Sequence, residues 1–172
     1  MSQLLKDNDM ILRAIEPIDL EWLYQLENDT WLWKVSDTHK PFSRDVLVRY
    51  LENAHQDIYT AKQLRLVIEW SAQAIGLIDL FDFEPKHKRA SIGIVVKEAF
   101  RKKGMAKRAL VLIIDYAKDI LDCHQLVATM TEDNEESIRL FESAGFKRTG
   151  VREDWVFEKG LYKSEYFYQR IL

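Results

Sequence analysis

The sequence predicts one α/β domain, built on a mixed β-sheet with helices on both faces. Its 172 residues suit a single domain, because domains average about 150 residues. Three runs in the middle of the chain alternate as strands, and the next run changes to helical spacing before alternation returns. No Pro-, Gly- or Ser-rich linker and no internal repeat divides the chain, so we expect residues 1–172 to form one domain.

The N-terminal third is predicted to hold a strand and two helices. Residues 10–15 form a short apolar run typical of a strand. Pro17 follows in a position typical of a first helical turn, ahead of Leu20, Leu23 and Tyr24 at helical spacing. Ser43 suits the N-cap of a second helix, whose apolar face carries Val46, Leu47, Tyr50 and Leu51.

The strands and the remaining helices follow in order. Residues 64–70, 74–81 and 89–96 are strand-like, and the short connection between the first two predicts an antiparallel hairpin. Residues 106–121 have helical spacing and residues 126–130 alternate, which predicts a β-α-β unit. A helix from about residue 135 should end at Gly145, a residue that favours a left-handed C-cap. The predicted closing hairpin joins 146–157 to 161–171 through a turn at 158–160.

The charge is unevenly distributed. The net charge of −3 argues against a protein that coats nucleic acid or a polybasic membrane-surface protein. Residues 86–108, however, contain nine basic residues and one acidic residue, which leaves −11 for the rest of the chain. Arg101, Lys102 and Lys103 precede the helix that begins near Gly104, where cations oppose the helix dipole. A bound phosphate would explain this placement, and a solvated basic face around an ordinary turn is the alternative.

Other classes of site are excluded by composition or spacing. The chain has no GxxxxGK[ST] loop and no GxGxxG fingerprint. Its single Cys cannot form an internal disulfide, and its histidines lack metal-ligand spacing, so we predict a reducing compartment and no metal. Residues 1–7 do not resemble a secretory signal, and the longest aliphatic run, 109–114, is far below the roughly 18 residues of a membrane span. We therefore expect a cytoplasmic protein without membrane or nucleic-acid partners.

Three segments resemble the GNAT superfamily of acetyl-CoA-dependent N-acetyltransferases. They are the strand 92–96 (IGIVV), residues 100–106 (FRKKGMA) and residues 134–146 (NEESIRLFESAGF). The second is similar to the family's pyrophosphate-binding pattern [QR]-x-x-G-x-[GA], and the third to its N-x-x-[SA]-x-x-[LF]-[YF]-x-x-x-G-F pattern. Within the superfamily the chain most resembles the branch of spermidine and ribosomal-protein N-terminal acetyltransferases. The resemblance implies a twisted, mostly antiparallel sheet with a splayed strand pair.

The resemblance also implies a set of residues that bind acetyl-CoA as cosubstrate. Backbone groups of Ile94, Val95 and Val96 would pair with the pantetheine arm. The pyrophosphate would lie on the backbone at the start of the next helix, at Arg101, Lys102, Lys103, Gly104, Met105, Ala106 and Lys107. Asn134 would contact the pantetheine while also suiting a helix N-cap. Ser137 and Phe141 of the same helix complete the set.

The catalytic groups are less clear from the sequence. An alkyl ammonium has a pKa of about 10, so the acceptor must lose a proton before it attacks a thioester. A backbone N–H near Val95 is a candidate donor to the oxyanion. Many family members have a Tyr as general acid where this chain has Phe141, which leaves Ser137, Tyr162 or no protein acid. Thr129 likewise stands where the N-terminal-protein branch often has a Glu.

The acceptor amine is also left open, as a polyamine, another small amine or a protein N-terminus. Asp79 is the candidate for amine binding or for base catalysis through water, with an exposed structural residue as the alternative. A polyamine site needs several carboxylates, yet Ser91 and residues 38–40 stand where the spermidine branch has acids. Additional charge is available from Glu27, Asp29 and Asp37. Three tryptophans are candidates for cation–π walls, although core packing is the favoured interpretation: Trp31, Trp33 and Trp155.

Three functions are compared. The leading one is an N-acetyltransferase that transfers acetyl directly in a ternary complex. The second, motivated by Phe141 and Thr129, is a catalytically weak acyl-CoA-binding domain with a regulatory or binding role. The third, a nucleic-acid-binding module using residues 86–108, is opposed by the acidic remainder of the chain. The resemblance to the branch also makes a homodimer possible.

Overall fold

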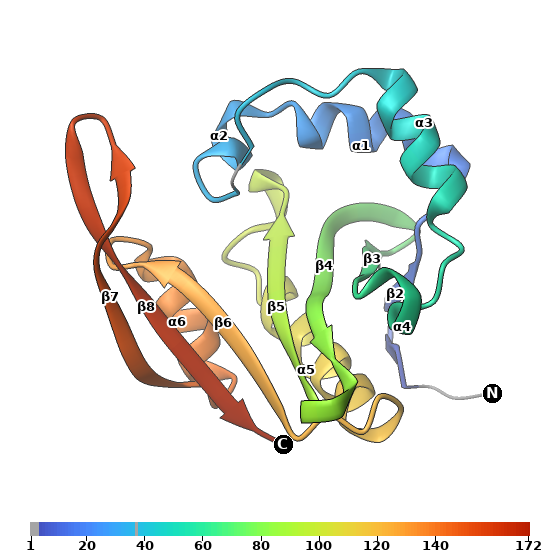
Figure 1. Ribbon diagram of the computed structural model, residues 1–172. Helices are drawn as coiled ribbons and strands as arrows, with labels where there is room; N and C mark the ends of the chain where they lie inside the picture. The colour runs from blue at the N-terminus through green and yellow to red at the C-terminus, as the bar shows by residue number, and fades with distance from the viewer. Residues whose placement is uncertain (1–3, 37) are drawn as a thin grey trace.

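The computed structural model describes residues 4–36 and 38–172, and in this part of the chain eight strands form one sheet with the order β1-β2-β3-β4-β5-β6-β8-β7 (Figure 1). Neighbouring strands are antiparallel except β5 and β6, which are parallel. This confirms the predicted mixed, mostly antiparallel sheet. The strands are β1 (Lys6–Asp7), β2 (Met10–Ala14), β3 (Leu64–Trp70), β4 (Gln73–Glu84), β5 (Arg89–Val96), β6 (Gln125–Thr131), β7 (Lys147–Glu158) and β8 (Leu161–Ile171).

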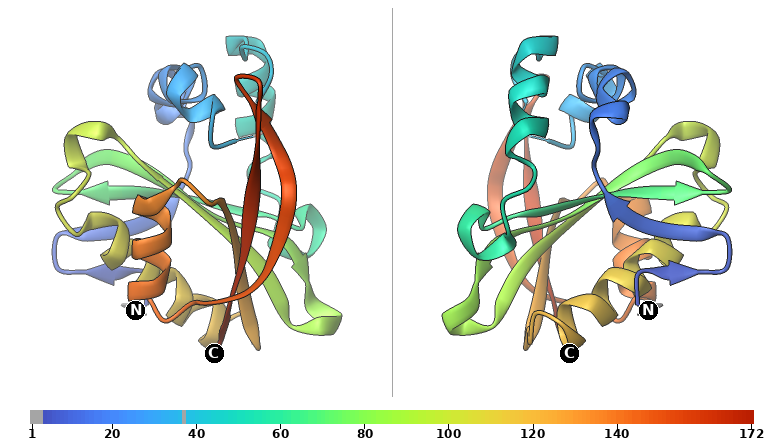
Figure 2. Two further views of the ribbon diagram at one scale, coloured as in Figure 1. Left: turned by 90° about the vertical axis from the view of Figure 1, so that its left-hand side faces the viewer. Right: turned by 90° about the vertical axis from the view of Figure 1, so that its right-hand side faces the viewer.

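Helices cover both faces of the sheet, as predicted. The helices α5 (Met105–Asp119) and α6 (Glu135–Ser143) pack on what we call the back face, in a core that includes Ala90 and Ile92 of β5. On the front face, Val67, Leu77 and Val95 pack with a second apolar cluster from α1 (Leu20–Glu27), α2 (Thr30–Trp33) and α3 (Arg44–Asn53). Figure 2 shows α1, α2 and α3 gathered at one end of the molecule, away from α5 and α6.

The local signals in the sequence explain where the helices begin and end. Ser43 caps α3 by accepting the N–H of Val46, and Asn134 caps α6 by accepting the N–H of Ser137. Gly145 follows α6 with a φ of +85°, a left-handed conformation that glycine adopts without strain. The closing hairpin turns at Lys159 and Gly160, as predicted.

Some elements and packing environments were not predicted. The short strand β1, the helix α2 and the helix α4 (Ile58–Ala61) are too brief to give a periodic pattern. Strand β4 extends beyond the predicted 74–81 because a bulge after Phe81 lets it continue to Glu84. The prediction of core packing is wrong for two tryptophans, because Trp31 and Trp155 have 39% and 59% of their surface exposed. Their rings stack instead on the guanidinium groups of Arg101 and Arg152, respectively.

Candidate active site

The strands β5 and β6 pair only at their beginnings and then splay apart (Figure 1). Their parallel pairing comprises Arg89 with Gln125, Ala90 with Leu126, and Ser91 with Val127. Beyond Ser91, β5 continues for five residues to Val96 and stays paired with β4 on its other side. In an antiparallel pair alternate residues direct their backbone groups away from the partner strand. The edge of β5 from Ile92 to Val96 therefore offers backbone donors and acceptors to the gap, which we call the splay.

The course of β5 along the splay depends on Gly76 of β4. A Cβ built on Gly76 would overlap the carbonyl oxygen of Val95 and lie 3.1 Å from the Cα of Val96. Only a glycine allows the Val95 carbonyl to approach β4 this closely. Gly76 is next to the register shift between Ile68 and Glu69, so β4 is irregular at this point. Nothing in the sequence indicates this contact, because Gly76 looks like any glycine in a strand.

The helix α5 begins at the end of the splay with an open N-terminus. Gly104 is its N-cap, with a φ of +79° and no side-chain hydrogen bond to the helix. A Cβ built on Gly104 would have no neighbour within 4 Å. The first N–H groups of a helix have no acceptor within the helix, and together with the dipole they favour an anion. Met105, Ala106 and Lys107 form the first turn of α5, so the structure places the predicted pyrophosphate residues around this open end.

The basic residues around this helix end are partly engaged within the protein. Lys102 pairs with Glu136 at 3.2 Å, and Lys103 donates to the carbonyl of Ala99 at 2.8 Å. Both ammonium groups are on exposed side chains, and that of Lys102 is 81% exposed. Arg108 is instead held on the N-terminal hairpin by Asp7 and Asp9. The local positive charge is therefore smaller than the composition of residues 86–108 indicates.

Arg101 joins the end of β5 to helix α2. Its backbone N–H donates to the carbonyl of Glu98 at 3.1 Å, and so is already paired within a turn. Its Nε donates to the carbonyl of Val96 at 2.8 Å, at the end of the splayed edge. Its guanidinium carbon is 3.6 Å from the centre of the Trp31 ring on α2. In this structure Arg101 thus contributes through its side chain, a role that the sequence analysis did not predict.

Helix α6 holds three of the predicted cofactor residues. The Oδ1 atom of Asn134 accepts the N–H of Ser137 at 3.2 Å, so the predicted N-cap is present. Ser137 is half-buried. Phe141 is 4% exposed and packs edge-to-face on Phe146, with ring centroids 5.0 Å apart. The position at which the resemblance implies a Tyr hydroxyl in many proteins is thus part of an apolar aromatic pair in this chain.

Asp79 lies on the front face within an ion-pair cluster that we call the Arg65 cluster. Both carboxylate oxygens of Asp79 accept from Arg65, at 2.8 and 2.9 Å. Arg65 also donates to Glu27 at 2.8 Å and lies over the ring of Tyr50 at 5.6 Å. Asp79 is opposite Gly93 of β5, inside the splay. This position agrees with the predicted role of Asp79 in amine binding. Both of its carboxylate oxygens, however, are already bonded to Arg65.

Burial sets the protonation behaviour of the Arg65 cluster. Burial raises the pKa of Glu27, and the nearby Asp79 raises it further, against the opposing effect of Arg65. Burial likewise raises the pKa of Tyr50. Burial opposes the charge of Arg65, but Asp79 and Glu27 outweigh it and raise the pKa of Arg65. Arg65 therefore stays charged, and with two carboxylates around it the ionised cluster has a net negative charge.

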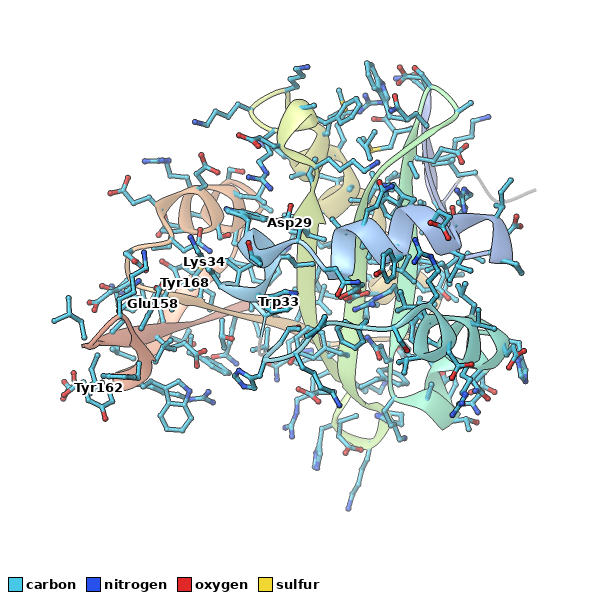
Figure 3. The ribbon with its side chains drawn as sticks, turned by 90° about the horizontal axis from the view of Figure 1, so that it is seen from above. Asp29, Trp33, Lys34, Glu158, Tyr162 and Tyr168 are labelled. Atoms are coloured by element: carbon cyan, nitrogen blue, oxygen red, sulfur yellow. The ribbon has the colours of Figure 1, made fainter. Side chains whose placement is uncertain are left out.

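The structure does not bring the three catalytic candidates together. Asp79 is on the front of β4, and Ser137 belongs to the back-face helix α6. Tyr162 is 63% exposed at the tip of the β7–β8 hairpin, with its ring 5.0 Å from that of Phe157. Figure 3 shows Tyr162 at the far end of this hairpin, well away from Asp29 and Trp33 on α2. In one copy of the chain, Tyr162 is therefore remote from the splay.

The acidic residues proposed as additional charge have different positions. Glu27 is part of the Arg65 cluster. Asp29 caps α2, where its Oδ1 accepts the N–H of Trp31 at 2.9 Å. Asp37 lies outside the described residues. Arg65 was not predicted as a site residue. The signal for it is its place on an alternating strand that pairs with β4, where it stands directly opposite Asp79.

A cavity of about 610 Å³, which we call the front cavity, lies where β5 and β6 are still paired. Ser91 and Val127, the last paired residues before the splay, line it together with Phe167. Charged and amide side chains complete much of its wall, namely Lys62, Asp82, Glu84, Arg89, Gln125 and Gln169. The sequence analysis did not find this cavity, because its residues come from separate segments of the chain.

Within 4–36 and 38–172, no three side chains of His, Cys, Asp or Glu gather in a way that could hold a metal ion. In the same ranges no helix combines the length and apolar character needed to cross a bilayer.

The sequence model of the acetyltransferase (GNAT) domain family matches residues 9–147. The spermidine N(1)-acetyltransferase of Escherichia coli K12 is 28% identical over 153 residues, which cover 89% of this chain and 81% of that protein. The spermidine N-acetyltransferase from Vibrio cholerae, solved with CoA and spermine, has a TM-score of 0.85 at 25% identity, covering 96% of both chains. A ribosomal L7/L12 alpha-N-protein acetyltransferase in complex with coenzyme A has the same TM-score at 22% identity, again over 96% of both chains, and so shares the fold.

Proposed function

The chain belongs to the GNAT acetyltransferase family, and from this premise we propose that it transfers an acetyl group from acetyl-CoA to a primary amine by direct attack in a ternary complex. One observation carries the proposal. The backbone edge of β5 is free along the splay and leads from the open N-terminus of α5 to the front face. A thioester and an amine can meet at this edge and react directly, so the reaction needs no covalent enzyme intermediate.

The residues around the splay suit acetyl-CoA as the acetyl donor. The free edge of β5 at Ile94 can add the pantetheine amides as a neighbouring strand would, whereas the predicted Val95 has its carbonyl turned toward Gly76 of β4. The first turn of α5 offers N–H groups to a pyrophosphate, and Gly104 leaves room for it. Val96 can join this pairing only if Arg101 releases its carbonyl, because Arg101 already donates to it.

The transfer itself needs few protein groups. The neutral amine nitrogen attacks the thioester carbon and the new C–N bond forms, the C–S bond breaks to release the CoA thiolate, and the nitrogen gives up one N–H proton to water to leave the neutral amide. We propose that backbone N–H groups of the β5 edge near Val95 stabilise the oxyanion. The negative charge of the Arg65 cluster draws the ammonium form to the front face, and water carries its proton to Asp79 or Glu27.

We propose that solvent protonates the leaving thiolate. Phe141 has no hydroxyl, and its ring is buried against Phe146. Ser137 is held in the first turn of α6, where its N–H bonds Asn134. Tyr162 is at the hairpin tip. Phe141 and Tyr162 therefore supply no acid at the splay in one copy of the chain, and we assign Ser137 to cofactor binding, so we expect no bell-shaped pH profile from a protein acid.

The proposal is tested by measuring free thiol release from acetyl-CoA with a panel of amines. The panel holds spermidine, small alkyl and aryl amines, and short peptides with free N-termini, and it includes spermidine because two of the relatives reported above are named for that acceptor. Amine-dependent release, with acetylated amine found by mass spectrometry, is the expected result. Binding of acetyl-CoA with no amine-dependent release would contradict the proposal and favour the acyl-CoA-binding alternative.

We also propose that the protein self-associates through the β7–β8 hairpin. Between residues 151 and 162 the hairpin exposes five large apolar side chains, namely Val151, Trp155, Phe157, Leu161 and Tyr162. The Vibrio cholerae relative has been solved in a dodecameric form. We expect light scattering to show an oligomer that Trp155→Ser weakens. A monomer at all concentrations would contradict this.

A further inference from the structure

The front cavity opens directly onto the place where the reaction is proposed to occur. Side chains alternate along β5, so its front-facing residues run in the order Val95, Gly93, Ser91, Arg89. Val95 is covered by the helices of the front face, whereas Ser91 and Arg89 line the cavity. Gly93 lies between them, and a Cβ built there would contact only the Phe81 ring, at 3.5 Å. A molecule in the cavity can therefore extend past Gly93 to the free edge of β5.

The charges around the front cavity are of both signs. Lys62 and Arg89 supply two cations, and Asp82 and Glu84 supply two carboxylates. Fourteen ion pairs join side chains in the described part of the chain, and none of them involves these four residues. All four charges are thus available to an occupant of the cavity.

The uncharged part of the front cavity's lining includes a pair of hydrogen-bonded amides. The amide nitrogen of Gln169 donates to the amide oxygen of Gln125 at 2.7 Å, across the pair β6–β8. Each amide has two donors and two acceptor lone pairs, so both keep unused donors and acceptors after this bond. Ser91 adds a hydroxyl, and Phe167 adds an aromatic face. Such a wall matches a ligand that both donates and accepts hydrogen bonds.

These features discriminate between classes of acceptor amine. A protonated polyamine has only positive charges and only donors, so it could pair with Asp82 and Glu84, but Lys62 and Arg89 would repel it and the amide donors of Gln125 and Gln169 would find no acceptor on it. A peptide alternates N–H and C=O groups and can carry charges of both signs. The cavity volume of about 610 Å³ is within the roughly 300–1,000 Å³ of ligand sites, which is room for a few residues.

We propose that the front cavity binds the first residues of a peptide or protein chain, with the free N-terminal amine at Gly93 as the acetyl acceptor. This inference rests on the proposed function and specifies its substrate class. The cavity is open to solvent at its charged rim, where Lys62, Asp82 and Arg89 are exposed, so a longer chain can leave it there. The acceptor is recognised through its backbone amides and balanced charge.

The experiment compares two acceptors in the full chain by thiol release. One is a tetrapeptide with a free N-terminus and side chains of both signs, and the other is spermidine. The same peptide with a blocked N-terminus is the control for acetylation elsewhere. We expect kcat/KM to be at least about tenfold higher for the free peptide, because each charge-assisted hydrogen bond is worth that much or more.

Charge reversal on the cavity wall sharpens the test. Arg89→Glu should lower kcat/KM for the peptide about tenfold and raise it for spermidine, while acetyl-CoA binding stays unchanged. Lys118→Glu makes the same charge change on an exposed position of the back-face helix α5 and should leave the preference unaltered. If Arg89→Glu does not fold by circular dichroism, Arg89→Gln should reduce the peptide preference in the same direction.

The outcomes separate this inference from the proposed function. A wild-type preference for spermidine, or a peptide rate that neither Arg89 variant changes, would overturn the inference while leaving the proposed acetyl transfer intact. A chain that binds acetyl-CoA and acetylates no amine would overturn the proposed function itself. A peptide preference that Arg89→Glu reverses and Lys118→Glu does not would support the inference.

Discussion

The two sides of the splay differ in how tightly the protein holds them. On the β5 side the strand is packed beneath α1–α3, and Gly76 and Arg101 fix its backbone through direct contacts. On the β6 side the sheet ends in the β7–β8 hairpin, whose outer strand is exposed along most of its length. The β5 side has the proposed cofactor edge and buried charges, whereas the hairpin has exposed aromatic residues. The backbone is therefore held most tightly on the β5 side, where the thioester would be bound.

The largest expected effect comes from removing the cation of the Arg65 cluster. Arg65→Met leaves Glu27 and Asp79 facing each other with no counter-ion and should destabilise the protein by about 3 kcal/mol or more. The matched variant on the hairpin is Arg152→Met, which breaks a surface pair with Glu165 and should cost at most about 1 kcal/mol. Urea unfolding measures both. Equal losses would show that the two sides are not built differently.

A second expected difference concerns two glycines. Gly76→Ala forces a Cβ against the Val95 carbonyl and should cost about 1–3 kcal/mol of stability, with a weaker affinity for acetyl-CoA because the splayed edge shifts. Gly150→Ala is the control on β7, where a Cβ would stand 3.6 Å from the Cβ of Phe167, an ordinary contact. Thermal unfolding and calorimetric titration with acetyl-CoA test the pair. Unchanged affinity in Gly76→Ala would contradict the role of this glycine.

The two regions should also respond to pH in opposite directions. Burial raises the pKa of Glu27 above its ordinary value of 4.5, so folding loses stability as pH rises from 4.5 through the folded-state pKa. The Lys163 ammonium bonds Asp133 and Glu158 and lowers the pKa of each, so their contribution is present above their ordinary values of 3.8 and 4.5 and is lost as pH falls.

Two substitutions separate these contributions to the pH dependence. Glu27→Gln should reduce the loss of stability above pH 4.5, and Lys163→Met should reduce the loss below it. Urea midpoints at a series of pH values give the two slopes. If the stability of either variant changes with pH as steeply as that of the wild type in the range concerned, the corresponding group does not titrate as its surroundings indicate.

The sequence predicted what can be inferred within single elements. Periodicity gave the strands and long helices, and Ser43, Asn134 and Gly145 marked helix ends correctly because capping is local. The motif around Gly104 gave the open start of α5. These features depend on residues a few positions apart, and their physics needs no knowledge of the rest of the chain.

Long-range packing could not be predicted in the same way. Arg65 is 38 residues from Glu27 and 14 from Asp79, and nothing along the chain indicates that the three side chains meet. The exposed Trp31 is explained only by Arg101 in a distant loop. The front cavity likewise draws on five segments of the chain. A periodic pattern shows which side chains share a face, but not which faces come together.

The smallest expected effect tests whether the exposed hairpin takes part in the chemistry. Tyr162→Phe removes the hydroxyl at the tip, which is 63% exposed and remote from the splay in one copy of the chain. We expect kcat and KM for acetyl-CoA to stay within about twofold of wild type, because a surface substitution away from the site changes little. A large drop in kcat with unchanged folding would contradict this. Such a drop would mean that the hairpin of a second copy brings Tyr162 to the thioester, making the exposed side a part of the active site.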